Sequence, residues 1–368
     1  MSTLFVKVCT YTVSDHPNAD ALVLASPSGT TWQCCIRKHF PFEGELAVYV
    51  PIDSILPAGM AEKIGLPNSK EDKPYRVRTI KLRGALSQGL LLPLSTLVDA
   101  GFLPEFTSGL VTEVSEDSLL SDEFICERYY KIGDDVASLL NITKWEPPLP
   151  ESADLIPNPS GFKNYTSPEH FKNFPEVLQD GEEVILTEKI HGTSWRAGWV
   201  EVAHAEGPVF QFFVGTKRNT VFPGADNKYT RVAVEYNVER RLQDYPGYIA
   251  YGELYGKGIQ SLQYGRTGHA LRIFDVWNGQ CFLNWEQLKS FSIETGLPLV
   301  PTLFEGSWDA AVLSHRFGPA FEGDHIREGF VVKPIIERWD YKHALGRVIL
   351  KVVSEDYLLK NYDVDEIG

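Results

Sequence analysis

The residues best suited to covalent chemistry lie in the second half of the sequence, where a lysine ends a strand-like run. Val184 to Lys189 reads as a strand, and Gly192 allows the chain to turn tightly just beyond it. A lysine amine is a nucleophile only when it is unprotonated, which requires burial or a neighbouring cation to lower its pKa. Lys189 is therefore a candidate nucleophile, although a K-x-H-G segment taken alone is also typical of a surface lysine before a turn.

Two further segments carry side chains that could bind a nucleotide. Arg218, in the run Val-Gly-Thr-Lys-Arg-Asn, has the planar guanidinium suited to a phosphate or a ribose edge. Strand alternation places Glu253 on the face of Tyr251 and Tyr255, where a carboxylate needs a ribose hydroxyl, a lysine or a metal as partner. The structural alternatives are a solvated loop cation for Arg218 and a solvent-facing carboxylate for Glu253.

The last chemically suggestive segments contain an aromatic residue, a carboxylate and two lysines. Phe274 could stack on a base, although a plain core phenylalanine is an equal alternative. Glu328 and Lys333 stand at the two ends of a short strand, and their odd spacing points them to opposite faces of an ideal strand. Lys351 lies inside an apolar run, which is costly unless its amine reaches an anion. Structural salt bridges are the alternative for both lysines.

The elements that must position these residues form an α+β domain dominated by antiparallel sheet. Strand-like runs alternate with loops, and one helix is predicted over Pro168 to Leu178. The apolar positions of that helix are Phe171, Phe174, Val177 and Leu178.

The first third of the chain is built differently, from short strand-like runs separated by glycine and proline. The predicted strands are Leu4 to Val13, Ala21 to Ala25, Trp32 to Ile36, Leu46 to Pro51, Tyr75 to Leu82 and Gly89 to Leu92. About five short strands with few helices favour a small OB-like β-barrel. A proline-rich stretch then predicts a linker, so the expected organisation is residues 1–145, linker 146–162 and residues 163–368.

Composition limits the possible partners. The 368 residues include 43% hydrophobic and 23% charged residues, which is ordinary for a folded protein, and the length favours two domains. The formal net charge of −14 argues against nucleic acid unless cations gather locally. Two local clusters do occur, at Arg76 to Arg83 and at Thr216 to Asn219.

The sequence also carries signals about compartment. It has no apolar run long enough to span a bilayer, and its N-terminus lacks the pattern of a secretory signal. Its five cysteines form no C-x-x-C pair and no zinc-like spacing with histidine, and they read as small buried hydrophobes. We therefore expect a cytoplasmic protein in a reducing compartment, without a membrane partner.

Taken in order, the candidate segments resemble a known superfamily. They read K-x-H-G, G-T-K-R-N, G-E-L-Y-G, F-D-V, E-G-F-V-V-K-P and a final strand lysine. This order resembles the covalent nucleotidyltransferases, which include ligases and capping enzymes. T-E-K-I-H-G-T-S is most similar to the RNA ligase branch that contains the phage nick-sealing and trypanosome editing ligases. The resemblance covers roughly residues 163–360, and the OB-like domain before it further resembles the Deinococcus-type RNA ligases.

The resemblance implies a fold, a nucleophile and a nucleotide-binding set. The second domain would be a nucleotidyltransferase (adenylation) domain in which Lys189 becomes linked to AMP. Glu188 would help to recognise adenine, and Phe274 would stack on it. Arg218 would contact the ribose or phosphate side of the nucleotide.

The resemblance also implies a metal site and phosphate contacts. Glu253 would hold the ribose or a metal-bound water, and Glu328 would assist metal binding. Lys333 and Lys351 would hold the phosphates. Attack on the α-phosphate of ATP needs cations and a divalent metal, so Mg²⁺ or Mn²⁺ is expected. The final motif of the phage-type enzymes often has two alternating lysines, but valines follow Lys351, which leaves the second phosphate contact unassigned.

The implied activity is ATP-dependent joining of RNA ends, in RNA repair. Lys189 would take AMP from ATP, AMP would pass to a 5′-phosphate end, and a 3′-hydroxyl would then attack as AMP leaves. DNA ligases and capping enzymes usually carry an OB domain after the final motif, and the sequence beyond Lys351 leaves no room for one. That feature, with no NAD-specific module in front, favours ATP over NAD. Two alternatives stay open: a GTP-using capping-type guanylyltransferase and a non-catalytic RNA-binding module.

The first domain is expected to contact RNA. The segment His16 to Leu22 resembles the start of the tRNA-binding OB domains attached to some aminoacyl-tRNA synthetases. Four cations near its later strands are candidate RNA contacts: Arg76, Arg78, Lys81 and Arg83. Arg76 and Arg78 share one face of the strand, whereas Lys81 and Arg83 share the other. A continuous phosphate-binding stripe of these cations would therefore need a bulge or bend in the strand. An exposed, solubilising edge strand is the alternative. We expect a monomer that binds RNA and ATP.

Overall fold

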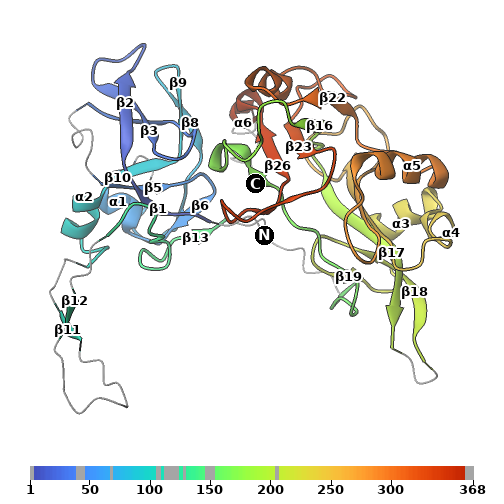
Figure 1. Cartoon of the computed structure of the whole chain (residues 1–368). Helices are drawn as coiled ribbons and strands as arrows, with labels where there is room; N and C mark the ends of the chain where they lie inside the picture. Colours follow the sequence, from blue (N-terminus) through green and yellow to red (C-terminus); the bar gives the residue numbers. More distant parts are fainter. Residues whose placement is uncertain are drawn as a thin grey trace. The chain divides into compact units, whose positions relative to one another are not determined.

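The structure, a computed structural model, describes residues 4–38, 46–66, 69–104, 109–111, 124–126, 130–145, 154–203 and 207–360. The chain divides into two compact units, one within Thr3–Pro148 and the other within Leu149–Gly368. Figure 1 colours them along the sequence from blue to red. In these described ranges, no helix is both long and apolar enough to cross a membrane.

The first unit consists mainly of short antiparallel strands (Figure 1). They pair in the orders β1-β5-β10, β2-β3-β4 and β13-β6-β7, with two separate pairs, β8-β9 and β11-β12. The bounds are β1 (Lys7–Cys9), β2 (Tyr11–Asp15), β3 (Leu22–Pro27), β4 (Cys34–Arg37), β5 (Ala47–Val50), β6 (Ser54–Leu56), β7 (Tyr75–Arg76), β8 (Thr79–Leu82), β9 (Ala85–Gln88), β10 (Leu90–Pro93), β11 (Gly109–Val111), β12 (Phe124–Cys126) and β13 (Thr143–Lys144). Two short helices are α1 (Met60–Lys63) and α2 (Leu94–Asp99).

Strand β5 forms the centre of this unit because both of its faces are buried. Val48 and Val50 belong to one apolar cluster, and Ala47 and Tyr49 belong to another. Two of the predicted strands are each broken into two. The strand predicted over Leu4 to Val13 forms β1, which pairs with β5, and β2, which pairs with β3. The strand predicted over Tyr75 to Leu82 forms β7, which pairs with β6, and β8, which forms a hairpin with β9. Such partner changes are how short strands bend around a small core.

The second unit contains two larger sheets. A six-stranded antiparallel sheet has the order β14-β19-β18-β17-β20-β21. Its bounds are β14 (Leu155–Ile156), β19 (Thr220–Val221), β18 (Val209–Gly215), β17 (Thr193–Val202), β20 (Ile249–Gly256) and β21 (His269–Trp277). A five-stranded sheet has the order β15-β26-β23-β16-β22. Its bounds are β15 (Glu169–His170), β26 (Leu350–Val353), β23 (Gly329–Pro334), β16 (Glu183–Glu188) and β22 (Thr302–Ser307), and a hairpin of β24 (Trp339–Asp340) and β25 (Gly346–Arg347) connects β23 to β26.

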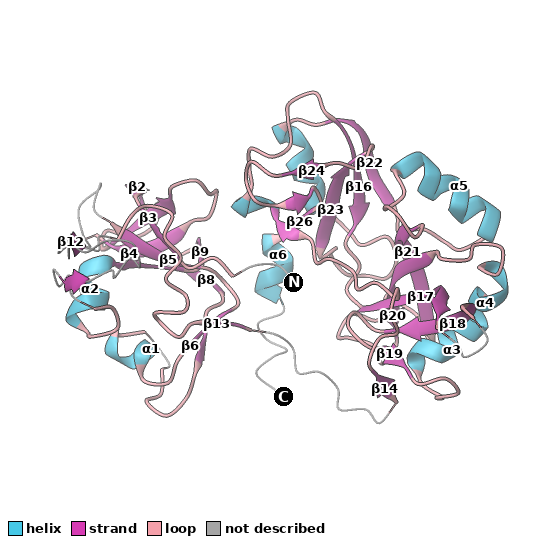
Figure 2. Cartoon of the chain, turned by 60° about the horizontal axis from the view of Figure 1, so that its bottom comes forward, coloured by secondary structure: helices cyan, strands magenta, loops and turns pink. Residues whose placement is uncertain are grey.

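Helices cover one face of the six-stranded sheet, as Figure 2 shows for α3 (Lys228–Glu235), α4 (Val238–Arg241) and α5 (Trp285–Thr295). Their buried residues pack with those of β17, β20 and β21 in one apolar cluster. The opposite face of the same sheet meets the five-stranded sheet through Tyr251, Phe282 and Ile349. The two sheets therefore share a core, and the residues at its margin are positioned by both.

The helix predicted over Pro168 to Leu178 is wrong. The segment forms β15, the short 3₁₀ turn η1 (Phe171–Asn173) and a loop. The backbone at Phe174 is not helical, with φ of −140° and ψ of 54°, and the following Pro175 has no N–H to continue a helix. The four apolar positions are nevertheless buried, because the segment packs on the sheet beside β26. Two more short helical elements follow later in the chain, the 3₁₀ helix η2 (Ala310–Arg316) and α6 (Glu355–Lys360).

Candidate active site

Lys189 stands directly after β16, at the point where β23 begins. Its backbone N–H donates to the carbonyl of Gly329 at 3.0 Å, which aligns the two strand ends. Its ε-amine forms an ion pair with the carboxylate of Glu328, and the two side chains are 28% and 11% exposed. Gly329 has a φ of +148°, and a Cβ there would collide with the Val352 carbonyl. Glycine after Glu328 is therefore what allows this carboxylate to turn toward Lys189.

Gly192 brings a second carboxylate to the same place. Its own backbone has no positive φ, so the glycine is not needed for an unusual turn conformation. A Cβ at Gly192 would instead lie 2.9 Å from Cγ of Glu253 and closer still to the Leu254 carbonyl. The glycine therefore permits a close approach between the K-x-H-G turn and β20, whose Glu253 acts electrostatically on Lys189.

The charges around Lys189 differ from those expected from the sequence. Burial alone would lower the pKa of Lys189, but the carboxylates of Glu328 and Glu253 outweigh it and raise that pKa. Burial would raise the pKa of Glu328, but Lys189 and His191 together hold it below its ordinary value. Burial raises the pKa of Glu253 to about 8. The neighbours of Lys189 are thus carboxylates rather than the cations expected, and in this state its amine carries a proton.

His191 connects this cluster to the C-terminal helix. Its Nδ1 lies 2.7 Å from the hydroxyl of Tyr357 in α6, and its Nε2 lies 3.1 Å from the hydroxyl of Ser261. The same Nδ1 is 3.8 Å from Glu328 Oε2. Sequence reasoning gave His191 no role and did not consider Tyr357, because no motif spacing connects α6 to the turn after β16.

The strand register places Lys351 on the face of the sheet toward which Lys189 points. Val331 pairs with Thr187 on one side and with Lys351 on the other, and cross-strand partners share a face. Lys189 follows Thr187 by two residues and so continues this face. Glu188 pairs with the buried Phe330 and belongs to the opposite face.

Glu188 is a buried carboxyl with an incomplete set of partners. Oε1 accepts a hydrogen bond from the Phe321 backbone N–H at 3.2 Å. Oε2 is buried and has no hydrogen-bond partner among the described residues. Burial raises the pKa of Glu188 to about 7. The side chain is therefore an acceptor that a ligand could satisfy.

Phe274 lies at a β-bulge. Tyr251 pairs with Asp275 and Gly252 pairs with Ile273, so Phe274 has no Cα partner on β20. Its ring centroid is 4.9 Å from that of Tyr165, and the partly buried ring packs against the core shared by the two sheets. A bulge re-aims a side chain relative to its strand, which suits an aromatic ring that faces a ligand.

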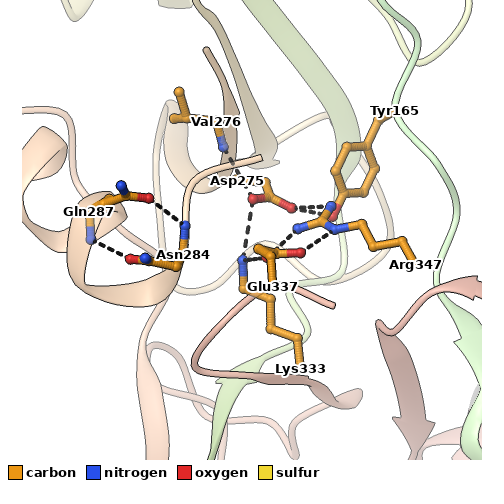
Figure 3. Close-up of polar contacts among 8 residues, drawn as sticks. All are labelled: Tyr165, Asp275, Val276, Asn284, Gln287, Lys333, Glu337 and Arg347. Carbon is orange, nitrogen blue, oxygen red and sulfur yellow. Dashed lines mark hydrogen bonds and ion pairs between the residues drawn. The ribbon is translucent and has the colours of Figure 1, made fainter. Parts of the chain in front are cut away.

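Lys333 lies in a separate buried ion cluster, shown in Figure 3. Its Nζ is 3.3 Å from Asp275 Oδ1 and 3.0 Å from Glu337 Oε1. Arg347 contacts the same two carboxylates at 2.7 and 2.6 Å, and the Tyr165 hydroxyl donates to Asp275 at 2.9 Å. Two cations and two anions thus tie β21 to β23, and the phosphate-binding role expected of Lys333 stays a prediction.

A buried arginine fixes the loop that carries Arg218. Arg196, which is 1% exposed, donates to Asn158 Oδ1 at 2.6 Å and to Asn164 Oδ1 at 2.7 Å. The Asn158 amide in turn donates to the Arg218 carbonyl at 2.7 Å. The backbone of Arg218 is therefore held by the segment that precedes the sheet, a connection no sequence motif indicated.

The four basic candidates of the first unit have different surroundings. Arg76 contacts Asp53 at 2.8 Å and lies over the Trp145 ring at 3.3 Å, so its guanidinium already has intramolecular partners. Arg78 is half-buried between β7 and β8. Lys81 and Arg83 are exposed on the β8–β9 hairpin. Asn18 donates to the Arg83 carbonyl at 3.1 Å, so the His16 to Leu22 motif supports this hairpin.

The two carboxylates beside Lys189 suit a hydrated divalent cation. No group of three or more His, Cys, Asp or Glu side chains in the described ranges could hold a metal by itself. Glu253 and Glu328 nevertheless influence each other electrostatically, and the buried Glu328 Oε2 has no hydrogen-bond partner in the part of the chain that the structure describes. Two adjacent oxygen donors with free coordination capacity match the preference of Mg²⁺ or Mn²⁺ for carboxylates and water.

Part of the second unit is similar to a known protein family. Residues 182–353 match the model of the RNA ligase family. This part of the chain is therefore similar to an RNA ligase domain. The match contains Lys189, Glu253 and Glu328, and it agrees with the resemblance to RNA ligases that the sequence motifs indicated. Residues 7–94 match an OB-fold domain, which confirms the OB-like domain predicted before the ligase domain.

Solved structures share the fold of the ligase domain and of the whole chain. RNA ligase from Naegleria gruberi with pyrophosphate has a TM-score of 0.72 at 22% identity, covering 98% of this chain and 99% of that chain. Substituted forms of that ligase match similarly. One with ATP and manganese has a TM-score of 0.75 at 22% identity, covering 98% and 100% of the two chains, and one with AMP and manganese has 0.73 at 21%, covering 99% and 100%. No curated protein sequence matches the chain.

Proposed function

We propose that this protein is an ATP-dependent RNA ligase that joins a 3′-hydroxyl end to a 5′-phosphate end through AMP bound covalently to Lys189. The observation that carries the proposal is the convergence of Lys189, Glu328 and Glu253 from β16, β23 and β20. Two carboxyl groups beside an amine nucleophile could hold a divalent cation, which phosphoryl transfer from ATP needs to offset the charge of the phosphates. The Naegleria structures with ATP, AMP and manganese support the choice of nucleotide.

The reaction would proceed in three steps, two transfers of AMP followed by its release. The Lys189 amine attacks the α-phosphorus of ATP, a P–N bond forms, and the P–O bond to pyrophosphate breaks. The 5′-phosphate of an RNA end then attacks the same phosphorus and frees Lys189. In the third step a 3′-hydroxyl attacks the 5′-phosphate and AMP leaves. Such sealing would serve RNA repair.

Lys189 must lose its proton before the first step. Its ion pair with Glu328 holds that proton in the present arrangement, so the contact has to be exchanged before the amine can attack. Glu253 and Glu328 would hold Mg²⁺ or Mn²⁺, which would supply positive charge against the phosphates. Lys351, on the same face, would hold a phosphate, and Arg218 would hold the ribose or phosphate edge.

Selection of ATP over GTP would rest on Glu188 and Phe274. The unpartnered Glu188 oxygen can accept a hydrogen bond from the 6-amino group of adenine, whereas guanine presents a carbonyl oxygen at that position. The partly buried Phe274 ring would stack on the base. The capping-type alternative predicts labelling by GTP, so parallel incubation with α-phosphate-labelled ATP and GTP separates the two.

The experiment that tests the proposal is intact-mass measurement after incubation with ATP and Mg²⁺ or Mn²⁺. The expected result is a mass increase of one AMP, located on Lys189 by peptide mapping. An unmodified chain under both metals would favour the non-catalytic RNA-binding alternative. AMP on a different lysine would keep the activity but reject this site.

We further propose that residues 1–145 bind RNA through the exposed Lys81 and Arg83, and that residues 146–162 link them to a ligase domain of residues 163–368. Lys81→Glu with Arg83→Glu should weaken RNA sealing several-fold, since removing a cation that binds phosphate reduces the affinity for RNA, and should leave self-adenylation unchanged. Lys70→Glu with Lys73→Glu is the matched control elsewhere in this unit. An equal loss of RNA sealing in both double variants would contradict a specific role of the β8–β9 hairpin in RNA binding.

We also propose that the enzyme acts as a monomer in the cytoplasm. Sedimentation at micromolar concentration should give the mass of one chain, about 41 kDa. A dimer that persists on dilution would contradict the monomer. Fractionation of the source cells tests the compartment.

A further inference from the structure

A groove outside the residues assigned to catalysis lies beside β18. It has a volume of about 800 Å³ and is lined by Phe212 to Val214 of β18, by the segment Val221–Asp226, and by α3 and the residues just after it. None of its lining residues takes part in the Lys189 cluster or in the buried cluster of Figure 3. The groove therefore has no part in the proposed ligase chemistry.

The walls of the groove expose large apolar side chains to solvent. Phe222 is 54% exposed and Val234 is 79% exposed, and Phe210 next to the groove is 46% exposed. Single exposed apolar residues are ordinary, but several gathered around one concavity are typical of a binding surface. The expected occupant therefore presents apolar side chains.

The edge of β18 is open along the same groove. On one side β18 pairs with β17 from Val209 to Gly215, whereas on the other side β19 pairs with it only at Gly215. Within the described ranges, no strand continues the sheet beyond residues 209–214. Exposed strand edges of this kind accept an added strand from another polypeptide.

The rim of the groove is acidic. Asp226, Glu235 and Glu239 line it, whereas Arg231 is the one cation among the lining residues of the described chain. Arg231 forms an ion pair with Asp226 at 2.6 Å, so the carboxylates of Glu235 and Glu239 dominate the remaining charge. An occupant that carries lysine or arginine would complement this rim.

Charge excludes the nearer candidates for the occupant. The last eight residues of this chain include Asp363, Asp365 and Glu366 and no cation, so they would be repelled. A second copy would bring the same acidic rim against itself. RNA would bring its phosphates against Glu235 and Glu239. Of these possibilities, only a basic polypeptide from another protein combines favourable charge with the ability to extend a sheet.

We propose that this groove binds an extended, apolar segment with basic flanks from a partner protein, which pairs with the open edge of β18. Backbone hydrogen bonds to residues 209–214 would fix the segment, and its alternate side chains would contact Phe212, Phe222 and Val234. Its lysines or arginines would contact Glu235 and Glu239. A partner held there would recruit the ligase without contacting its catalytic residues.

The test uses the full chain and a labelled synthetic peptide of about nine residues, with alternating valine and threonine between lysine pairs. Binding is measured by fluorescence anisotropy. Val234→Lys should weaken binding at least about tenfold, because it removes apolar contact and repels the basic flanks. Ile293→Lys on α5 is the matched control, since Ile293 is equally exposed, at 82% against 79%. It should leave the affinity unchanged.

Several results would overturn the proposal. These are no binding of the basic peptide at millimolar concentration, equal binding of a version flanked by glutamate, and equal binding of a version N-methylated at alternate residues. Loss of RNA binding in Val234→Lys would assign the groove to RNA instead, and a change of oligomeric state would assign it to self-association. Self-adenylation should be normal in both variants, so failure here is distinguishable from failure of the proposed ligase activity.

Discussion

Two lysines of the ligase domain sit at opposite ends of neighbouring strands, and each forms ion pairs with carboxylates in a different way. Lys189 has one direct partner, Glu328, and both side chains keep some contact with solvent, at 28% and 11% exposure. Lys333 has two partners, Asp275 and Glu337, and all three are at most 9% exposed. The first pair can exchange its contacts, whereas the second is enclosed.

The charged groups of the second cluster are also more completely partnered than those of the first. Arg347 completes a set of two cations and two anions around Asp275. Around Lys189, by contrast, two carboxyl groups face one amine, burial raises the pKa of Glu253 to about 8, and Glu328 Oε2 has no hydrogen-bond partner among the described residues. Buried polar groups normally find full compensation, so an incompletely partnered cluster indicates a candidate ligand site. The comparison therefore favours Lys189 as the lysine whose partners can be exchanged for a ligand.

The largest expected effect is the loss of chemistry when Lys189 is replaced. Lys189→Ala should reduce self-adenylation by at least about a thousandfold, because no other group takes over a covalent nucleophile. Lys189→Arg keeps the positive charge beside Glu328 but lacks the nucleophilic amine, and it should be equally inactive. Both are measured with α-phosphate-labelled ATP. Labelling of either variant at wild-type level would show that Lys189 is a structural lysine like Lys333.

The next largest effect is on stability, in the enclosed cluster. Asp275→Asn leaves two buried cations short of a partner and should lower the free energy of unfolding by about 3–5 kcal/mol. Denaturant unfolding measures it, with Asp226→Asn of the exposed Asp226–Arg231 pair as a control that should change little. An unfolding free energy close to that of the wild type in Asp275→Asn would contradict the prediction that the cluster around Asp275 stabilises the fold.

The sequence predicts much of this site because its motifs are local. Strand alternation places Glu253 on the face of Ile249 and Tyr251, and these two residues do pack together between the sheets. The order of the motifs also identifies the RNA ligase family, which the match over residues 182–353 confirms. The OB-like first domain follows from short strands and turn residues in the same way.

Other features depend on contacts that no local pattern encodes. The helix expected at Pro168 to Leu178 has the right apolar spacing, but β26, about 180 residues later, supplies a strand partner for it. The pKa of Lys189 depends on Glu328, which approaches only because Gly329 and Val352 are packed closely. Arg76 reads as a free cation in the sequence, yet Asp53 and Trp145 meet it in the fold.

A smaller effect should follow from loosening the Lys189 cluster without removing any charge. Tyr357→Phe deletes the hydroxyl that lies 2.7 Å from His191 Nδ1, so His191 is held less firmly beside Glu328. Tyr357 would act as a positioning residue, and the rate of AMP transfer should fall about tenfold while ATP affinity stays unchanged. Tyr341→Phe, at an 82% exposed tyrosine, is the control. A parallel loss of ATP affinity would argue for a general disturbance of α6 instead.

The smallest effect concerns Glu188, a carboxyl that has no direct ion-pair partner in the described structure and so extends the comparison to a third case. Burial raises its pKa from 4.5 to about 7, so the folded state favours the protonated form. Its contribution to stability is therefore present below about pH 4.5 and is lost as pH rises through about 7. Glu188→Gln, which cannot ionise, should gain roughly 1 kcal/mol relative to wild type between pH 5 and pH 6. Thermal unfolding at the two pH values measures this difference, and a pH-independent difference would show that Glu188 is paired like Asp275.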